Sequence, residues 1–133
     1  MNYTYSDVDG NETIHSDIGF VKEVLQRPYS YWQQNGGDSA IQVSSKERLI
    51  FFKLEQGVFI MQHPDYLSPV ITLNKKAEAI VHYVGGEPMA VPDICLCNEA
   101  TSFEIIGHYI LSNGLLTPSY QWTDIYELIE DVK

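Results

Sequence analysis

Hydrophobic residues recur at helical spacing in two stretches of the chain. In the first stretch, the apolar positions that share one helical face are Ile18, Val21, Val24 and Leu25. Ser16 or Asp17 can cap the start of this helix, and Pro28 ends it. In the second stretch, the apolar stripe consists of Ala100, Phe103, Ile106, Ile110 and Leu111. Asn98 suits the N-terminal cap of this helix, and Gly114 its C-terminal end.

Outside these helices, alternating or short apolar runs predict β-strands. Runs at 40–44, 48–54 and 58–62 are joined by short connections and predict an antiparallel meander. The other extended runs are 1–6, 12–15, 70–73, 78–84, 89–91, 93–96 and 119–122, and a short acidic helix follows through residue 132. The sequence therefore predicts a single α+β domain over residues 1–133. We expect an antiparallel sheet of about five to seven strands packed with two main helices.

The net charge limits the partners that the chain can bind. Eighteen Asp and Glu residues against eight Lys and Arg residues give a formal net charge of −10 over 133 residues. A protein of this sign is attracted to basic surfaces and repelled by phosphate backbones, so we expect no nucleic-acid binding. The apolar runs are far shorter than the roughly 20 residues of a membrane span, and the first residues lack a secretory signal. We therefore expect a cytoplasmic protein that does not enter a membrane.

Residues that could carry chemistry are few and scattered. Cys95 and Cys97 would share one face of a strand, where a disulfide would be strained, so we interpret them as reduced structural thiols. None of the four histidines has metal-ligand spacing; they are His15, His63, His82 and His108. The acidic turn at 7–11 has its glycine at the wrong position for a calcium loop. The sequence predicts no metal, no cofactor and no catalytic residue.

Both ends of the chain are acidic, and the C-terminal end also carries aromatic residues. The carboxylates of the first 17 residues are Asp7, Asp9, Glu12 and Asp17. Those that follow Trp122 are Asp124, Glu127, Glu130 and Asp131, and Tyr120 and Tyr126 lie beside them. Tyrosine and tryptophan are favoured interface anchors, and carboxylates attract lysine and arginine, so these residues can form a docking surface for a basic partner. The alternative is that acidic ends only keep the protein soluble.

A second aromatic segment lies near the middle of the chain. Residues 29–37 include Tyr29, Tyr31 and Trp32 and end in two glycines, which predicts a loop. These aromatic residues can form a binding surface or cover a sheet edge. If a pocket lies between this loop and the sheet, the chain is instead a small ligand-binding or enzymatic domain.

The C-terminal half resembles a known family. The pattern starts at Val91-Pro92 and continues through a helix that contains Ala100, Phe103 and Tyr109. It ends with Asn113-Gly114, Pro118 and the run Tyr120-Gln121-Trp122. This order resembles the first immunity-protein family of bacterial polymorphic toxin systems over roughly residues 77–124, while the N-terminal half matches only in its helix-then-meander order. The chain departs from the family at Leu115 and Leu116, where a basic residue is common, and at Gln121, where an apolar one is commoner.

The resemblance implies a stoichiometric inhibitor and not an enzyme. Proteins of this family are small, acidic and cytoplasmic, and they are typically encoded beside deaminase-type toxins. The implied partner is a cognate toxin domain with a basic surface, whose active site or substrate groove the inhibitor covers. The residues that we expect to contact it are Tyr120, Trp122, Asp124, Tyr126 and Glu127, with Tyr31 and Trp32 as a second patch. Trp122 can instead belong to the core. A structural subunit that dimerises through an edge strand is a third possibility.

Overall fold

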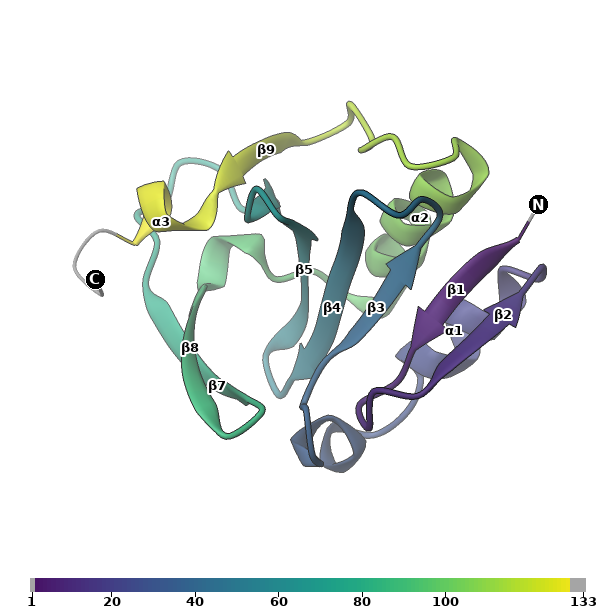
Figure 1. Cartoon of the computed structure of the whole chain (residues 1–133). Coiled ribbons are helices and arrows are strands. Elements are labelled where there is room, and N and C mark those ends of the chain that lie inside the picture. Colours follow the sequence, from purple (N-terminus) through teal and green to yellow (C-terminus); the bar gives the residue numbers. More distant parts are fainter. Residues whose placement is uncertain (1, 130–133) are drawn as a thin grey trace.

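A seven-stranded antiparallel sheet runs through the computed structural model, which describes residues 2–129 (Figure 1). In spatial order its strands are β2 (Glu12–His15), β1 (Tyr3–Ser6), β3 (Ser39–Gln42), β4 (Arg48–Leu54), β5 (Gly57–His63), β6 (Leu67–Val70) and β9 (Gln121–Asp124). A separate antiparallel hairpin is made of β7 (Ala79–Val84) and β8 (Glu87–Pro92). The helices are α1 (Gly19–Leu25), α2 (Glu99–Leu111) and α3 (Ile125–Leu128), with short 3₁₀ turns η1 (Tyr29–Gln33) and η2 (Asp93–Cys95). The predicted α+β class is confirmed.

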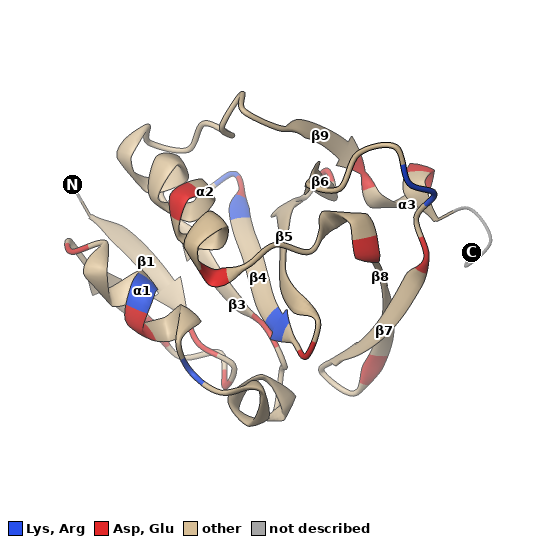
Figure 2. Cartoon of the chain, turned by 180° about the vertical axis from the view of Figure 1, so that it is seen from behind, with Lys and Arg blue, Asp and Glu red and all other residues tan. Residues whose placement is uncertain are grey.

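Both faces of the central strands are covered. Helices α1 and α2 pack together over one face (Figure 2). Strand β4 carries Phe51 toward this side, where its ring lies 5.8 Å from that of Trp32. The next residue, Phe52, points to the opposite face, where its ring stacks on that of His82 from β7 at 4.2 Å. Because both phenylalanines are fully buried, the apolar run of β4 reads as continuous and does not alternate.

The two predicted helices begin beside the capping residues that the sequence indicated. The Asn98 side chain accepts a hydrogen bond from the Thr101 N–H at 2.8 Å and so caps α2, as predicted. At the start of α1 the Asp17 carboxylate accepts from the Gly19 N–H at 2.8 Å. These local bonds satisfy donors that the first helical turn leaves without a partner.

Several predicted segments differ in position or type. The run 93–96 was expected to be extended, but its first three residues form η2, where the Asp93 carboxylate accepts a hydrogen bond from the Glu78 N–H. Strand β6 begins three residues earlier than the predicted run 70–73, and β9 begins two residues later than the predicted run 119–122. The expected acidic helix is present only as the short α3. Its predicted continuation, with Glu130 and Asp131, lies outside the described residues.

Candidate functional site

Strand β9 and helix α3 contain four of the five C-terminal residues of the predicted contact set, and Tyr120 immediately precedes β9. Strand β9 lies at one edge of the seven-stranded sheet, next to β6, and α3 follows it directly (Figure 1). The Asp124 carboxylate accepts from the Tyr126 N–H at 2.9 Å and caps α3. Tyr126 and Glu127 on that helix are exposed, whereas Tyr120, Trp122 and Asp124 are partly buried. Tyr126 and Glu127 are therefore the members of this set that are most accessible to a partner.

Trp122 contributes to both the core and the surface. Its indole N–H donates to the Thr117 carbonyl at 2.8 Å, and its side chain packs on the buried core. In the sheet it stands opposite Pro69 of β6. Because the ring is only partly buried, Trp122 anchors β9 and leaves part of its surface to solvent.

Tyr66 joins this surface, although the sequence did not point to it. It precedes β6, and its ring lies edge-to-face with that of Tyr126 at a centroid distance of 5.4 Å. The side chains are 37% and 52% exposed, respectively. The Tyr66 carbonyl accepts from the Ile125 N–H at 3.1 Å, so the turn and α3 are bonded to each other. The only sequence signal for Tyr66 was an aromatic residue directly after the turn His63-Pro64-Asp65. Only the fold places it beside Tyr126.

Carboxylates neighbour both members of the tyrosine pair in the sequence. Asp65 immediately precedes Tyr66, and Asp124 and Glu127 flank Tyr126 in sequence. Figure 2 shows acidic residues at the end of β9 and on α3. We call the set Asp65, Tyr66, Asp124, Tyr126 and Glu127 the β9–α3 surface. Tyrosine faces attract cations, and carboxylates pair with them, so this arrangement suits lysine or arginine side chains of a partner.

In the second predicted patch, the expectation that Trp32 contacts a partner is wrong, whereas Tyr31 is partly exposed. Residues 29–33 form η1 and not an open loop, and Trp32 is fully buried. Its ring packs at 5.8 Å from Phe51 and 5.1 Å from Tyr31. A side chain with no exposed area cannot touch a partner in this fold. The buried Trp32 ring instead stabilises the core.

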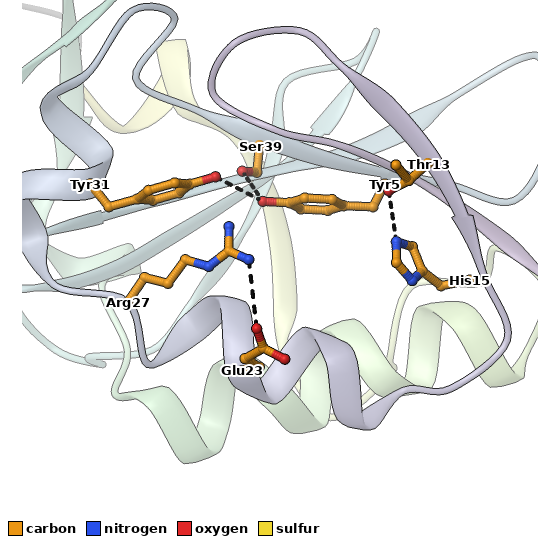
Figure 3. Close-up of polar contacts among 7 residues, drawn as sticks. All are labelled: Tyr5, Thr13, His15, Glu23, Arg27, Tyr31 and Ser39. Carbon is orange, nitrogen blue, oxygen red and sulfur yellow. Dashed lines mark hydrogen bonds and ion pairs between the residues drawn. The ribbon is translucent and has the colours of Figure 1, made fainter.

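Tyr31 belongs to a polar cluster between η1 and the sheet (Figure 3). Its hydroxyl lies 3.4 Å from that of Tyr5, which is also 2.9 Å from the Ser39 hydroxyl. The Arg27 guanidinium lies 4.8 Å from the centre of the Tyr31 ring. Burial is the main cause that raises the pKa of the Tyr5 phenol, so this group stays protonated. The Tyr5–Ser39 contact is buried and the Tyr5–Tyr31 contact partly buried, an arrangement typical of structural bonding.

Two hollows of the described surface are lined by segments other than residues 29–32. One of about 420 Å³ is bordered by the β1–β2 turn, the residues before β3, and β4. Its acidic lining residues are Asp7, Asp9, Glu12 and Asp38, and Arg48 also lines it. Another, of about 440 Å³, lies beside the β4–β5 turn and the start of α2. The predicted ligand pocket near Tyr29 to Trp32 therefore gains no support from these hollows.

Burial raises the pKa of the Asp38 carboxyl, against the opposing influence of Arg48 and His82. Between the unfolded and the raised folded pKa the folded protein binds more protons, so its stability falls as the pH rises. We expect Asp38→Asn to raise the melting temperature more at about pH 7 than at about pH 3, because only the wild type bears the desolvated charge at the higher pH. Thermal unfolding of both proteins checks this. An equal difference at the two pH values would contradict it.

Metal-ligating residues do not converge in the part of the chain that the structure describes. Among residues 2–129, no group of three or more His, Cys, Asp or Glu side chains is placed to hold a metal ion. Cys95 and Cys97 are buried free thiols, and burial raises the pKa of Cys95 to about 11. Such a thiol is a poor nucleophile at neutral pH. Within the same residues, no helix is long and apolar enough to cross a bilayer.

Comparison with known proteins does not assign this chain to a family. No protein-family model matches the chain, and no curated protein matches it.

Proposed function

We propose that this chain is an immunity protein, which binds a cognate toxin domain and covers its active site or substrate groove. The observation that carries the proposal is the β9–α3 surface, where two exposed tyrosines contact each other and carboxylates neighbour each of them in the sequence. The sequence resemblance to the first immunity-protein family supports the same function. On this view the protein acts by binding in a one-to-one complex and not by catalysis.

The electrostatics support a partner that itself acts on nucleic acid. A domain that binds a phosphate backbone must present lysine and arginine residues. A protein with a net charge of −10 is attracted to such a groove over long range. On contact, Asp65 and Glu127 take the positions of phosphates, and Tyr66 and Tyr126 stack on the guanidinium groups or enter the base pocket. A deaminase-type toxin is the partner that the resemblance implies.

The test is co-expression of this chain with the toxin domain encoded immediately upstream of it. We expect the cells to survive and the two proteins to co-purify in a one-to-one complex. Because surface charges are screened by salt, association should be slower and weaker at about 1 M salt than at about 0.1 M. Survival no better than with an empty vector, together with no complex at low salt, would refute the proposal.

A further inference from the structure

The outer face of the β7–β8 hairpin is apolar and unpartnered in the described structure. We propose that it forms the apolar centre of the surface that binds the basic toxin domain, with the β9–α3 surface as its acidic flank. The inference rests on the proposed function and specifies which part of the chain supplies the salt-independent binding energy.

The two sides of the hairpin differ in exposure. On the inner side, His82 and Val91 are buried, and the His82 ring stacks on Phe52 of the sheet. On the outer side, Val81 is 55% and Tyr83 61% exposed. Val81 stands opposite Ala90 and Tyr83 opposite Pro88, so the cross-strand neighbours on this side are uncharged as well. An exposed apolar face on an otherwise acidic protein is typical of an interaction site.

The β7–β8 hairpin is hydrogen-bonded to the segment that precedes β3. Its turn consists of Gly85 and Gly86, both with positive φ angles (59° and 85°), which a two-residue hairpin turn favours. The Gly85 N–H donates to the Gly36 carbonyl at 2.8 Å, and His82 Nε2 donates to the Gly37 carbonyl at 2.9 Å. A Cβ atom at Gly37 would lie 2.5 Å from the Tyr83 carbonyl oxygen, so this close approach requires glycine. A face that such contacts already hold in place loses less conformational entropy on binding than a free loop does.

The apolar face is continuous with the β9–α3 surface. Helix α3 lies beside β8 (Figure 1), and the two elements border a cavity of about 200 Å³. Its lining includes Pro88 and Ala90 of the hairpin and Tyr126 of α3. Tyr126 therefore belongs to both areas. A partner side chain that enters this cavity would contact the hairpin and the tyrosine pair at once, as expected of an anchor near the centre of an interface.

Charge favours a basic partner over a second copy of the chain. Glu87 at the start of β8 and Glu127 on α3 are exposed near the two ends of this area. Two copies would each carry a net charge of −10 and would repel one another. A toxin domain with a basic groove meets no such repulsion. Its apolar residues would pack on Val81 and Tyr83 while its basic residues pair with the carboxylates at the rim.

The test measures the affinity of the wild type, Val81→Asn and Tyr83→Ala for the catalytically inactivated toxin domain encoded immediately upstream. Ile14→Asn is the matched control, because Ile14 is a β-branched strand residue that is 73% exposed at the opposite edge of the sheet. We expect Tyr83→Ala to raise Kd about tenfold or more and Val81→Asn several-fold, with Ile14→Asn unchanged. The loss should be the same at low and high salt, because burial of apolar surface is not screened.

The possible failures can be told apart. If the wild type neither binds the toxin domain nor rescues cells, the proposed function is refuted, and this inference falls with it. If the wild type binds and both hairpin variants bind within about twofold of it, the hairpin is not part of the interface, and the proposed function stands. If sedimentation shows a dimer of the free protein that Tyr83→Ala dissociates, the occupant is a second copy and the inference is wrong.

Discussion

Replacing Trp32 by alanine is expected to lower the free energy of unfolding by about 3–5 kcal/mol, the largest stability effect that we anticipate. The ring is fully buried and packs on Phe51 and Tyr31, so its removal leaves a cavity against β4. Within the described residues the indole N–H has no hydrogen-bond partner, so Trp32→Phe should lose packing alone and cost less. Urea unfolding followed by circular dichroism measures both changes.

Tyr126→Ala is the control for this experiment. Tyr126 is 52% exposed, so its replacement should change stability by no more than about 0.5 kcal/mol. The same variant should weaken toxin binding, because Tyr126 belongs to the β9–α3 surface. If Trp32→Ala leaves stability unchanged and abolishes the complex, Trp32 is a contact residue after all, and its placement in the core is wrong.

Reversing two charges on the β9–α3 surface is expected to raise the Kd for the toxin domain at least about a hundredfold, because like charges in an interface cost several kcal/mol. The double variant is Asp65→Lys with Glu127→Lys, at two exposed positions that each adjoin one tyrosine of the pair in the sequence. The loss should shrink at high salt, in contrast to the salt-independent loss at the hairpin. Titration calorimetry at two salt concentrations measures both.

The control has the same net charge at another place. Each replacement of a carboxylate by lysine adds two charges, so the double variant has a net charge of −6 instead of −10. Glu55→Lys with Glu104→Lys gives the same total, at exposed positions in the β4–β5 turn and on α2. This control should slow association slightly and leave dissociation unchanged. Equal losses in the two double variants would show that net charge alone drives binding and that the β9–α3 surface is not the contact site.

The two main helices could be read from the sequence because their signals are local. Asn98 bonds to the N–H of Thr101 three residues later, and the apolar stripe of α2 needs only the helical period to be recognised. The hairpin β4–β5 was predictable for a similar reason, since a short turn sets its register from Leu54 opposite Gly57 to Arg48 opposite His63. Predicted boundaries near Pro92 and Pro118 were less accurate, because proline limits pairing without saying where a strand resumes.

The candidate surface was predictable only in part. Its C-terminal residues are neighbours in the chain, so their acidic and aromatic character was visible at once. Tyr66 was not, because it lies about sixty positions before Tyr126, and only the pairing of β6 with β9 brings them together. The apolar outer face of the β7–β8 hairpin was also hidden. Alternation along a strand separates two sides but does not say which one the rest of the protein covers.

By itself the sequence determined the net charge, the two helices, the central meander and the α+β class. These depend on composition and on interactions between residues close in the chain. Only the tertiary structure decided that Trp32 is buried while Tyr83 is exposed, and that β9 closes the sheet beside β6. Such outcomes depend on which distant segments pack together to remove the most apolar surface from water. That packing depends on contacts over the whole chain and not on any local segment.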